Sequence, residues 1–238
     1  MSGDRLFNVF VNPLAFLEVD EPWARVVEGK PDYEAVLRLL CTPGTDSDLD
    51  SLVARYKEIS TESKRLFAAP YEESILQKLV WPLRNAKASY MVGNYIGTIA
   101  LCGMVAEMAA ILYFEISETT MNGQEMSEGT EQKLFGRSFE KLGQERRVDV
   151  LSAYGIIDKE THGAFEAIRN VRRGYLHLYS QEHSKVAKDA VQAFQAALTI
   201  IVNLIGQEVN EGKIHLKPAF VRYLDKKGLL ESVQDTEK

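Results

Sequence analysis

Apolar residues recur at helical spacing along most of the chain, with short polar breaks between one run and the next. The strongest run is the last long one, residues 184–207. Its apolar side comprises Val186, Ala190, Phe194, Ala197, Ile201 and Leu204. Such spacing is typical of amphipathic helices that bury one face. Helices that follow one another with short breaks pack as a bundle, so the pattern predicts an all-α fold.

Three parts of the chain differ in composition. Residues 66–208 carry the predicted helical bundle. Residues 1–65 form an N-terminal extension, in which short apolar pieces and prolines precede an amphipathic helix over residues 48–60. We therefore expect this extension to be mostly helical. Residues 209–238 form a C-terminal tail of mixed character that ends in polar sequence.

Residues 91–116 are the most apolar segment and are long enough to cross a bilayer. Asn94 and Glu107 lie within it, and both are costly in lipid. Its C-terminal side carries Glu115 and Glu118 where a membrane helix would favour Lys or Arg. We therefore expect a central helix buried in the bundle, with a membrane helix as the alternative. Three glycines would let a neighbouring helix approach closely: Gly93, Gly97 and Gly103.

The middle of the chain predicts a polar loop followed by three helical pieces. Residues 117–130 are polar and acidic. The apolar spacing over residues 131–145 predicts one helix, and residues 147–157 continue the pattern as a second piece. The third helix covers residues 158–177, with Asp158 as its N-terminal cap. Pro82 should break or kink the helix predicted upstream of residue 91.

Charge and cysteine content limit the classes of function. The 238-residue chain has a net charge of −6, so it is not a general polyanion binder, and any nucleic-acid contact requires a local basic patch. Cys41 and Cys102 form no C-x-x-C pair, and the N-terminus lacks the features of a secretory signal, so we expect a cytoplasmic protein. The histidines show no metal-ligand spacing, and no nucleotide-binding glycine motif is present. The sequence therefore predicts neither a metal nor a cofactor.

The residues that could bind or act on a ligand are concentrated in residues 167–190, "AIRNVRRGYLHLYSQEHSKVAKDA". On a straight helix, Arg169, Arg173 and His177 lie four apart and share one face. Arg172 points elsewhere on such a helix, unless Gly174 distorts it. Arginine holds phosphate with a two-pronged donor fork, and histidine exchanges a proton near neutral pH. Together they suffice to cleave RNA without a metal, by attack of the 2′-OH on the adjacent phosphorus.

The same residues also fit a structural role. Arginines on a helix commonly pair with acidic neighbours, such as Glu166, Glu182 or Glu107. A histidine near a helix end can act as a cap or a surface group. A carboxylate as deep in an apolar segment as Glu107 needs a charged or hydrogen-bonding partner, and the arginine cluster is the obvious source.

The stretch "IRNVRRGYLH" followed by the helix "DAVQAFQAAL" resembles the HEPN superfamily, the higher eukaryotes and prokaryotes nucleotide-binding domain. The family motif is an Arg followed by several positions and a His, and Arg172 to His177 matches it with four residues between. The upstream helix is similar too, with Glu107 where the family often carries an inward Glu. The resemblance covers residues 70–208 and implies an up-down helical bundle.

By this resemblance the chain is a metal-independent endoribonuclease that works as a homodimer, in the manner of a toxin or defence effector with an antitoxin or other regulatory protein. Arg172 would grip the scissile phosphate and His177 would transfer a proton. Arg169, Asn170, Arg173 and Tyr175 would bind RNA or its phosphates, with Glu107 as structural support.

Two points remain open on the sequence alone. The position after the first Arg is often Asn in the family, but here it is Arg173, whereas an Arg-Asn pair occurs earlier as Arg169 and Asn170. Either Arg169 or Arg172 can therefore be the functional arginine. Inactive members are also common in the family. The alternative function is a non-catalytic nucleotide-, RNA- or protein-binding scaffold on the same bundle, in which Tyr175 packs the helix junction instead of stacking on a base.

Overall fold

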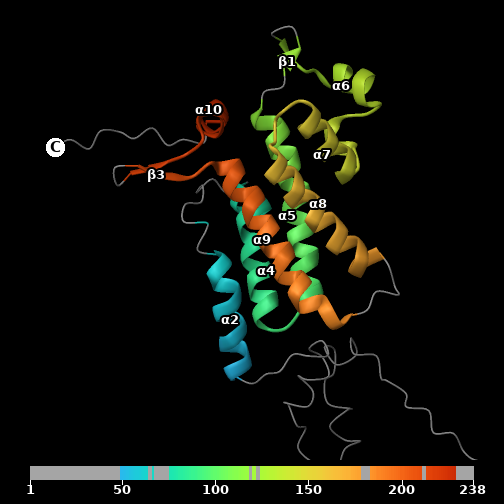
Figure 1. The fold of residues 1–238 in the computed structure, drawn as a ribbon. Coiled ribbons are helices and arrows are strands. Elements are labelled where there is room, and N and C mark those ends of the chain that lie inside the picture. The colour runs from blue at the N-terminus through green and yellow to red at the C-terminus, as the bar shows by residue number, and fades with distance from the viewer. Residues whose placement is uncertain are drawn as a thin grey trace, which may run out of the picture.

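The computed structural model describes residues 49–63, 66, 75–117, 120–121, 124–177, 183–210 and 213–228. Helices make up most of these residues, and the central ones run side by side (Figure 1). This arrangement confirms the predicted all-α helical bundle. Cys41 and the prolines at the start of the extension lie outside the described residues.

The central helix is α5 (Tyr95–Ile116). It packs against α4 (Trp81–Met91), α7 (Gln144–Ala153), α8 (Lys159–Arg172) and α9 (Val186–Ile205). Its first turn is capped by the Asn94 side chain, which accepts a hydrogen bond from the Gly97 N–H at 2.9 Å. Cys102 and Ala106 are among its fully buried residues, so the cysteine is a small core residue, as predicted.

α5 is the helix in the described part of the chain that is long and apolar enough to cross a membrane, with a mean hydropathy of 1.8. This criterion considers only length and composition, and the core helix of a soluble protein also satisfies it. Inside the bundle 56% of the apolar window is buried. Met104 is an exposed apolar residue of α5, whereas partly buried residues such as Met108 and Phe114 still pack against the core.

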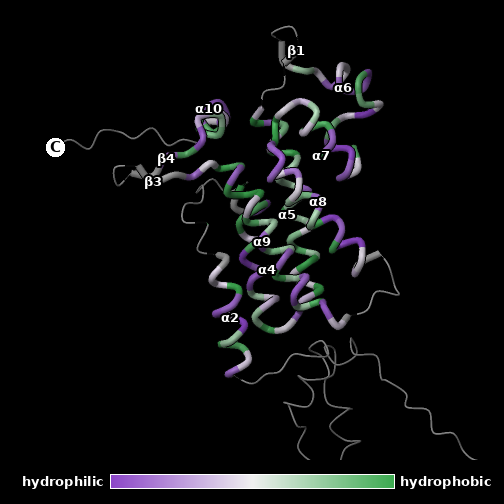
Figure 2. Tube along the Cα trace, in the orientation of Figure 1, coloured by the Kyte–Doolittle hydropathy of each residue, from purple (hydrophilic) through white to green (hydrophobic). Residues whose placement is uncertain are grey.

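The core lies between α5, α8 and α9, where the hydrophobic residues gather (Figure 2). α9 buries its predicted apolar stripe from Ala190 to Leu204. Tyr113 of α5 joins all three helices: its hydroxyl donates to the Ile200 carbonyl at 3.1 Å, and its ring meets that of Phe165 edge-on at 6.2 Å. Burial raises the pKa of Tyr113, so the hydroxyl stays a neutral donor.

The helix of the predicted extension joins the bundle. α2 (Leu49–Ser63) packs against α4 and α9 and buries Ile59. The Tyr90 hydroxyl donates to the Glu58 carboxylate at 2.6 Å, and Arg55 Nε donates to the Met91 carbonyl at 2.7 Å. Before α4 the chain winds as a π-helix, η2 (Leu76–Val80), and Pro82 then lies in the first turn of α4. The predicted break at Pro82 is therefore a change of helix type.

The single helix predicted over residues 131–145 is wrong. α6 (Glu128–Phe135) ends at Gly136, whose φ of 81° is left-handed and favours glycine. A 3₁₀ turn, η3 (Phe139–Lys141), follows before α7. The break turns Phe139 onto Phe114 of α5, with the two rings stacked 4.0 Å apart.

Two short hairpins also depart from the predicted all-helical pattern. β1 (Thr120–Met121) pairs with β2 (Gln124–Glu125) inside the segment predicted as a loop, and β3 (Glu208–Asn210) pairs with β4 (Lys213–His215) after α9. The tail then forms α10 (Pro218–Lys226), which buries Phe220 and Leu224. The Tyr223 hydroxyl donates to the Glu115 carboxylate of α5 at 2.7 Å, so this helix returns to the core.

The predicted cap of α8 is confirmed and should make part of the stability depend on pH. The Asp158 carboxylate accepts from the Thr161 N–H at 2.8 Å. Hydrogen bonds from the backbone and then the side chain of Thr161 lower the pKa of Asp158. A carboxyl with a lowered folded pKa stabilises the fold above its unfolded pKa of about 3.9 and loses that contribution as the pH falls through the folded value.

We therefore expect Asp158→Asn to lower the free energy of unfolding at pH 7, and the deficit to shrink as the pH falls below about 4. Asp158→Ala should cost about 1 kcal/mol at pH 7, because the cap itself is lost. Urea titrations across this pH range measure both effects, with Glu160→Gln as a control that removes an exposed carboxylate from the same turn. A deficit for Asp158→Asn that is the same at every pH would contradict a role for the charge.

Candidate functional site

The candidate site lies where α8 ends. α8 buries Ala164, Phe165 and Ile168 in the core, and its last turn carries Arg169 and Arg172 to the edge of the bundle. The backbone then widens into a π-helix, η4 (Arg173–His177), with Gly174 inside it. The distortion expected at Gly174 is therefore present. π turns are rare, and they frequently occur at functional sites.

Arg172 turns inward onto the central helix. Its Nη1 donates to Oε1 of Glu107 on α5, and the two side chains remain 26% and 33% exposed. The arginine that Glu107 requires is thus Arg172. The Arg172 Nε is buried and has no hydrogen-bond partner among the described residues. A buried donor left without a partner is uncommon in native structures, and sites that bind a ligand are among its recognised causes.

Gly103 makes room for this arginine. A Cβ atom at Gly103 would lie 2.6 Å from Arg172 Cδ, closer than real Cβ contacts, and 3.1 Å from Arg172 Nε, which is a tight contact. Gly103 lies one turn before Glu107, so the arginine stem crosses α5 at the glycine and reaches the carboxylate beyond it. A larger residue at position 103 would displace the guanidinium.

A second guanidinium approaches the same turn of α5 from α7. Arg147 Nη2 donates to the Glu140 carbonyl at 2.8 Å, and its Nη1 makes a long contact of 3.4 Å with the Glu107 carbonyl. Its Nε, like that of Arg172, is buried without a partner in the described part of the chain. Glu107 therefore holds Arg172 through its carboxylate and lies beside Arg147 through its backbone.

Arg169 is engaged by carboxylates on two helices. It donates to both oxygens of Glu166, at 3.0 Å from Nε and 2.6 Å from Nη2, and its Nη1 lies 3.2 Å from Glu145 of α7. The hydrogen bond to Glu166 is the main cause of its raised pKa. All three of its nitrogens are occupied, so Arg169 has little capacity left for a phosphate.

The remaining predicted residues divide between the surface and the core. Asn170 and Arg173 are exposed. Tyr175 is half-buried against the core, and its hydroxyl donates to the Asp189 carboxylate of α9 at 2.7 Å. Of the two roles considered for Tyr175, this contact fits the packing of the helix junction.

His177 is the last residue of η4, and its side chain lies outside what the structure describes. Its backbone position still bears on the choice of arginine. A helix closed by i to i+5 hydrogen bonds has more residues per turn than an α-helix, so residues four or five apart are separated by about one turn. Arg172 is five residues before His177, whereas Arg169 is eight residues before it.

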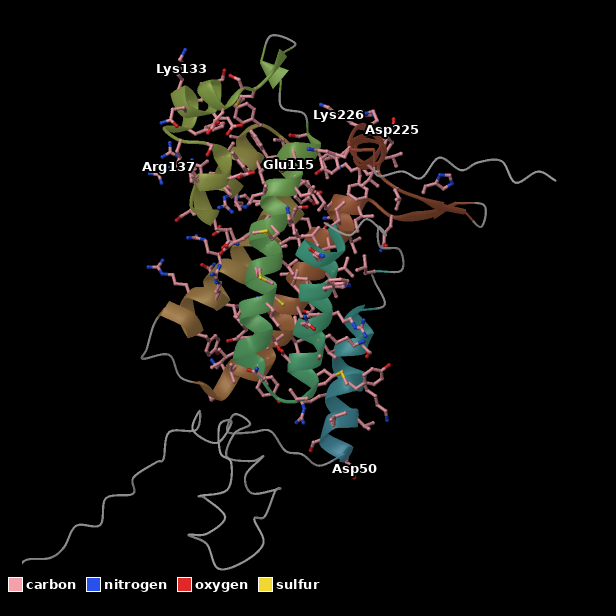
Figure 3. The ribbon with its side chains drawn as sticks, turned by 180° about the vertical axis from the view of Figure 1, so that it is seen from behind. Asp50, Glu115, Lys133, Arg137, Asp225 and Lys226 are labelled. Carbon is pink, nitrogen blue, oxygen red and sulfur yellow. The ribbon has the colours of Figure 1, made fainter. Side chains whose placement is uncertain are left out.

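Two residues of this network were not predicted, Arg147 and Glu145. The run Glu145-Arg146-Arg147 was a signal, because six of the thirteen arginines of the chain fall within residues 137–173. Residues 128–173 carry nine Lys and Arg against eight Asp and Glu, in a chain whose net charge is −6. Nitrogen-bearing side chains gather along α6, α7 and α8, and Lys133 and Arg137 point outward there (Figure 3).

Within the described residues, no group of three or more His, Cys, Asp or Glu side chains is placed to hold a metal ion. Comparison with models of protein families, with curated proteins and with solved structures found no match to this chain. Its function must therefore be argued from its own residues.

The close approach of Arg172 to Gly103 yields a stability test. Gly103→Ala should be less stable than Gly163→Ala by about 1–3 kcal/mol, because both gain helix propensity but the added methyl group at position 103 overpacks the Arg172 stem. Gly163→Ala is the matched control, since Gly163 is also inside a helix but a Cβ there meets nothing within 4 Å. It should stabilise the fold by up to about 1 kcal/mol, through helix propensity.

A double-mutant cycle isolates the contact. In an Arg172→Ala background, the methyl group added by Gly103→Ala no longer clashes with the arginine side chain. The destabilisation caused by the clash should therefore vanish. Free energies of unfolding from urea titration give the coupling. If Gly103→Ala has the same effect on stability with and without Arg172, the Arg172 side chain does not pack against Gly103.

Proposed function

We propose that this protein is a metal-independent endoribonuclease of HEPN type that cleaves RNA as a homodimer. The observation that carries the proposal is the position of Arg172. This residue is the arginine of the Arg-x4-His motif, it is oriented by Glu107 of the central helix, and the π-helix that ends at His177 begins at the next residue. A fixed guanidinium one turn from a histidine is an arrangement suited to phosphodiester chemistry.

In the proposed reaction, an imidazole takes the proton of the ribose 2′-OH as its oxygen bonds to the adjacent phosphorus. The bond from phosphorus to the 5′ oxygen breaks, and the leaving oxygen takes up a proton. The products are a 2′,3′-cyclic phosphate and a free 5′-OH. Arg172 stabilises the charge that builds on the phosphoryl oxygens. A homodimer supplies His177 twice, so that one imidazole can act as base while the other acts as acid.

Arg172 fits the phosphate-binding role better than Arg169. A phosphate is held by a fork of two parallel N–H donors. Arg169 directs three nitrogens at carboxylates, whereas Arg172 meets the Glu107 carboxylate through Nη1 alone. Its pairing with Glu107 fixes the direction of the guanidinium before RNA binds, which lowers the entropic cost of binding.

The surroundings of Arg172 are consistent with an RNA strand. The whole chain is acidic, but the segment from α6 to η4 is close to neutral and rich in arginine. Arg146 and Arg173 are exposed and are next in sequence to Arg147 and Arg172. A strand could thus be attracted locally without general affinity for polyanions. A toxin or defence effector in the cytoplasm, restrained by an antitoxin or other regulatory protein, would have such an activity.

A second candidate is a non-catalytic scaffold that binds RNA, a nucleotide or an acidic partner. The observation that favours it is the pairing of both Arg169 and Arg172 with carboxylates within a single chain. On that view the guanidiniums hold α5, α7 and α8 together, and the ligand contacts come from exposed residues such as Arg173 and Asn170.

Cleavage of a single-stranded RNA in EDTA tests the first candidate against the second. The wild-type protein should produce cyclic phosphate ends, and His177→Ala should reduce the rate by about 100-fold or more, as for loss of a proton-transfer group. Arg172→Lys retains the charge but loses the fork, so it should slow cleavage while the protein stays folded. His215→Ala, at an exposed histidine of β4, is the control.

The outcomes separate the alternatives. Binding of RNA without any cleavage by nuclease-free protein would leave only the scaffold. Loss of cleavage in Arg169→Lys, with normal cleavage in Arg172→Lys, would assign the function to the other arginine.

A further inference from the structure

A shallow depression along α7, open to solvent and called the hollow below, includes a residue of the arginine network. It has a volume of about 590 Å³ and is lined by Glu145, Arg146, Asp149, Val150, Ala153 and Tyr154. These residues recur at helical spacing, so they share one face of α7. Glu145 belongs both to this hollow and to the ion pair with Arg169, 3.2 Å from its Nη1. Glu145 therefore links the hollow to the arginine network at the end of α8.

Tyr154 offers an aromatic surface at one end of the hollow. Its side chain is 47% exposed, which is high for a large hydrophobic residue. The ring meets Phe135 edge-on, with centroids 6.5 Å apart and planes at 83°. Phe135 is itself buried among Phe114 and Phe139. The tyrosine is thus braced from beneath while remaining open to solvent, which suits it to stack on a flat ligand.

The polar residues of the hollow define which flat ligand fits. No hydrogen bond joins the Asp149 carboxylate to another residue in the described part of the chain, although its charge contributes to the raised pKa of Arg169. A carboxylate only accepts hydrogen bonds, and it does so through two oxygens side by side. Guanine presents two neighbouring N–H donors on its Watson–Crick edge, which match that geometry. Arg146 supplies a guanidinium for a phosphate at the other side of the hollow.

We propose that this α7 hollow binds an unpaired guanine of the RNA strand, stacked on Tyr154 and read by Asp149, while Arg146 holds an adjacent phosphate. The inference rests on the proposed ribonuclease function, because it names the substrate as single-stranded RNA with a guanine near the cleaved bond. Single-stranded bases are recognised in this way, by stacking on aromatic rings and by hydrogen bonds to their Watson–Crick edges. A base inside a duplex cannot reach the hollow.

Binding of short 2′-O-methyl oligonucleotides to the full-length protein tests the proposal. Such strands cannot be cut, because the attacking hydroxyl is blocked, so binding is measured separately from cleavage. Fluorescence anisotropy in EDTA should show tighter binding of a strand with one guanine among uridines than of oligouridine. Tyr154→Ala should weaken binding by about 5- to 100-fold, the range for loss of one stacked base. Tyr154→Phe keeps the ring and should bind normally.

Two further variants make the test specific. Asp149→Asn should remove the preference for guanine, a loss of about 10-fold in discrimination, and leave binding of oligouridine unchanged. Tyr56→Ala is the matched control, because Tyr56 of α2 is a tyrosine of the same exposure, 47%, outside the site. It should leave binding unchanged.

The results distinguish this inference from the ribonuclease proposal. If RNA is cleaved but Tyr154→Ala binds as tightly as Tyr56→Ala, the hollow is not a base site and the nuclease stands. If guanine binding depends on Tyr154 and Asp149 but no RNA is cleaved, the base site stands and the nuclease fails. Equal affinity for guanine-containing, guanine-free and duplex strands would overturn the inference.

Discussion

The pairing of Glu107 with Arg172 is the interaction on which the arrangement of the helices depends. α5 is the most apolar helix of the bundle, and a carboxylate on it must be matched by a donor from another helix. Glu107 keeps about a third of its side-chain surface exposed and Arg172 about a quarter. The desolvation penalty is therefore smaller than for a fully buried pair. α8 buries Phe165 and Ile168 in the core, and in this orientation Arg172 crosses α5 at Gly103 to reach Glu107.

The other charges follow from that orientation of α8. Once Arg172 faces α5, Arg169 is carried to the side where Glu145 of α7 stands, and α7 brings Arg147 beside the Glu107 carbonyl. Three guanidiniums from two helices are thereby held by carboxylates and carbonyls. This explains how an acidic chain concentrates arginines without strong mutual repulsion. It also separates the arginines that maintain the structure from exposed ones such as Arg146 and Arg173.

Much of the fold could be read from the sequence, because α8 and α9 combine a helical apolar period with a clear cap or a long stripe. The helix predicted over residues 131–145 failed because Gly136 interrupts the backbone while the apolar spacing continues across it. The hairpins have strands of two or three residues, too short for any alternation to show. At the site, the need of Glu107 for an arginine was predictable, but its choice of Arg172 depends on tertiary packing. The contact of Arg147 with the Glu107 carbonyl also depends on tertiary packing, because the two residues are forty positions apart in the sequence.

The π turn changes the spacing at which residues lie one turn before His177. With α-helical winding, His177 would follow Arg173 at a spacing of four, and Arg173 is exposed. With i to i+5 winding, positions about one turn before His177 include that of Arg172, the residue held by Glu107, which directly precedes the π-helix. Gly174 favours such a departure, because glycine lowers the stability of regular α-helix by about 1 kcal/mol and tolerates other backbone conformations. A sequence period alone cannot reveal this, since the extra residue in the turn changes the phase of the helix only where the chain is already packed.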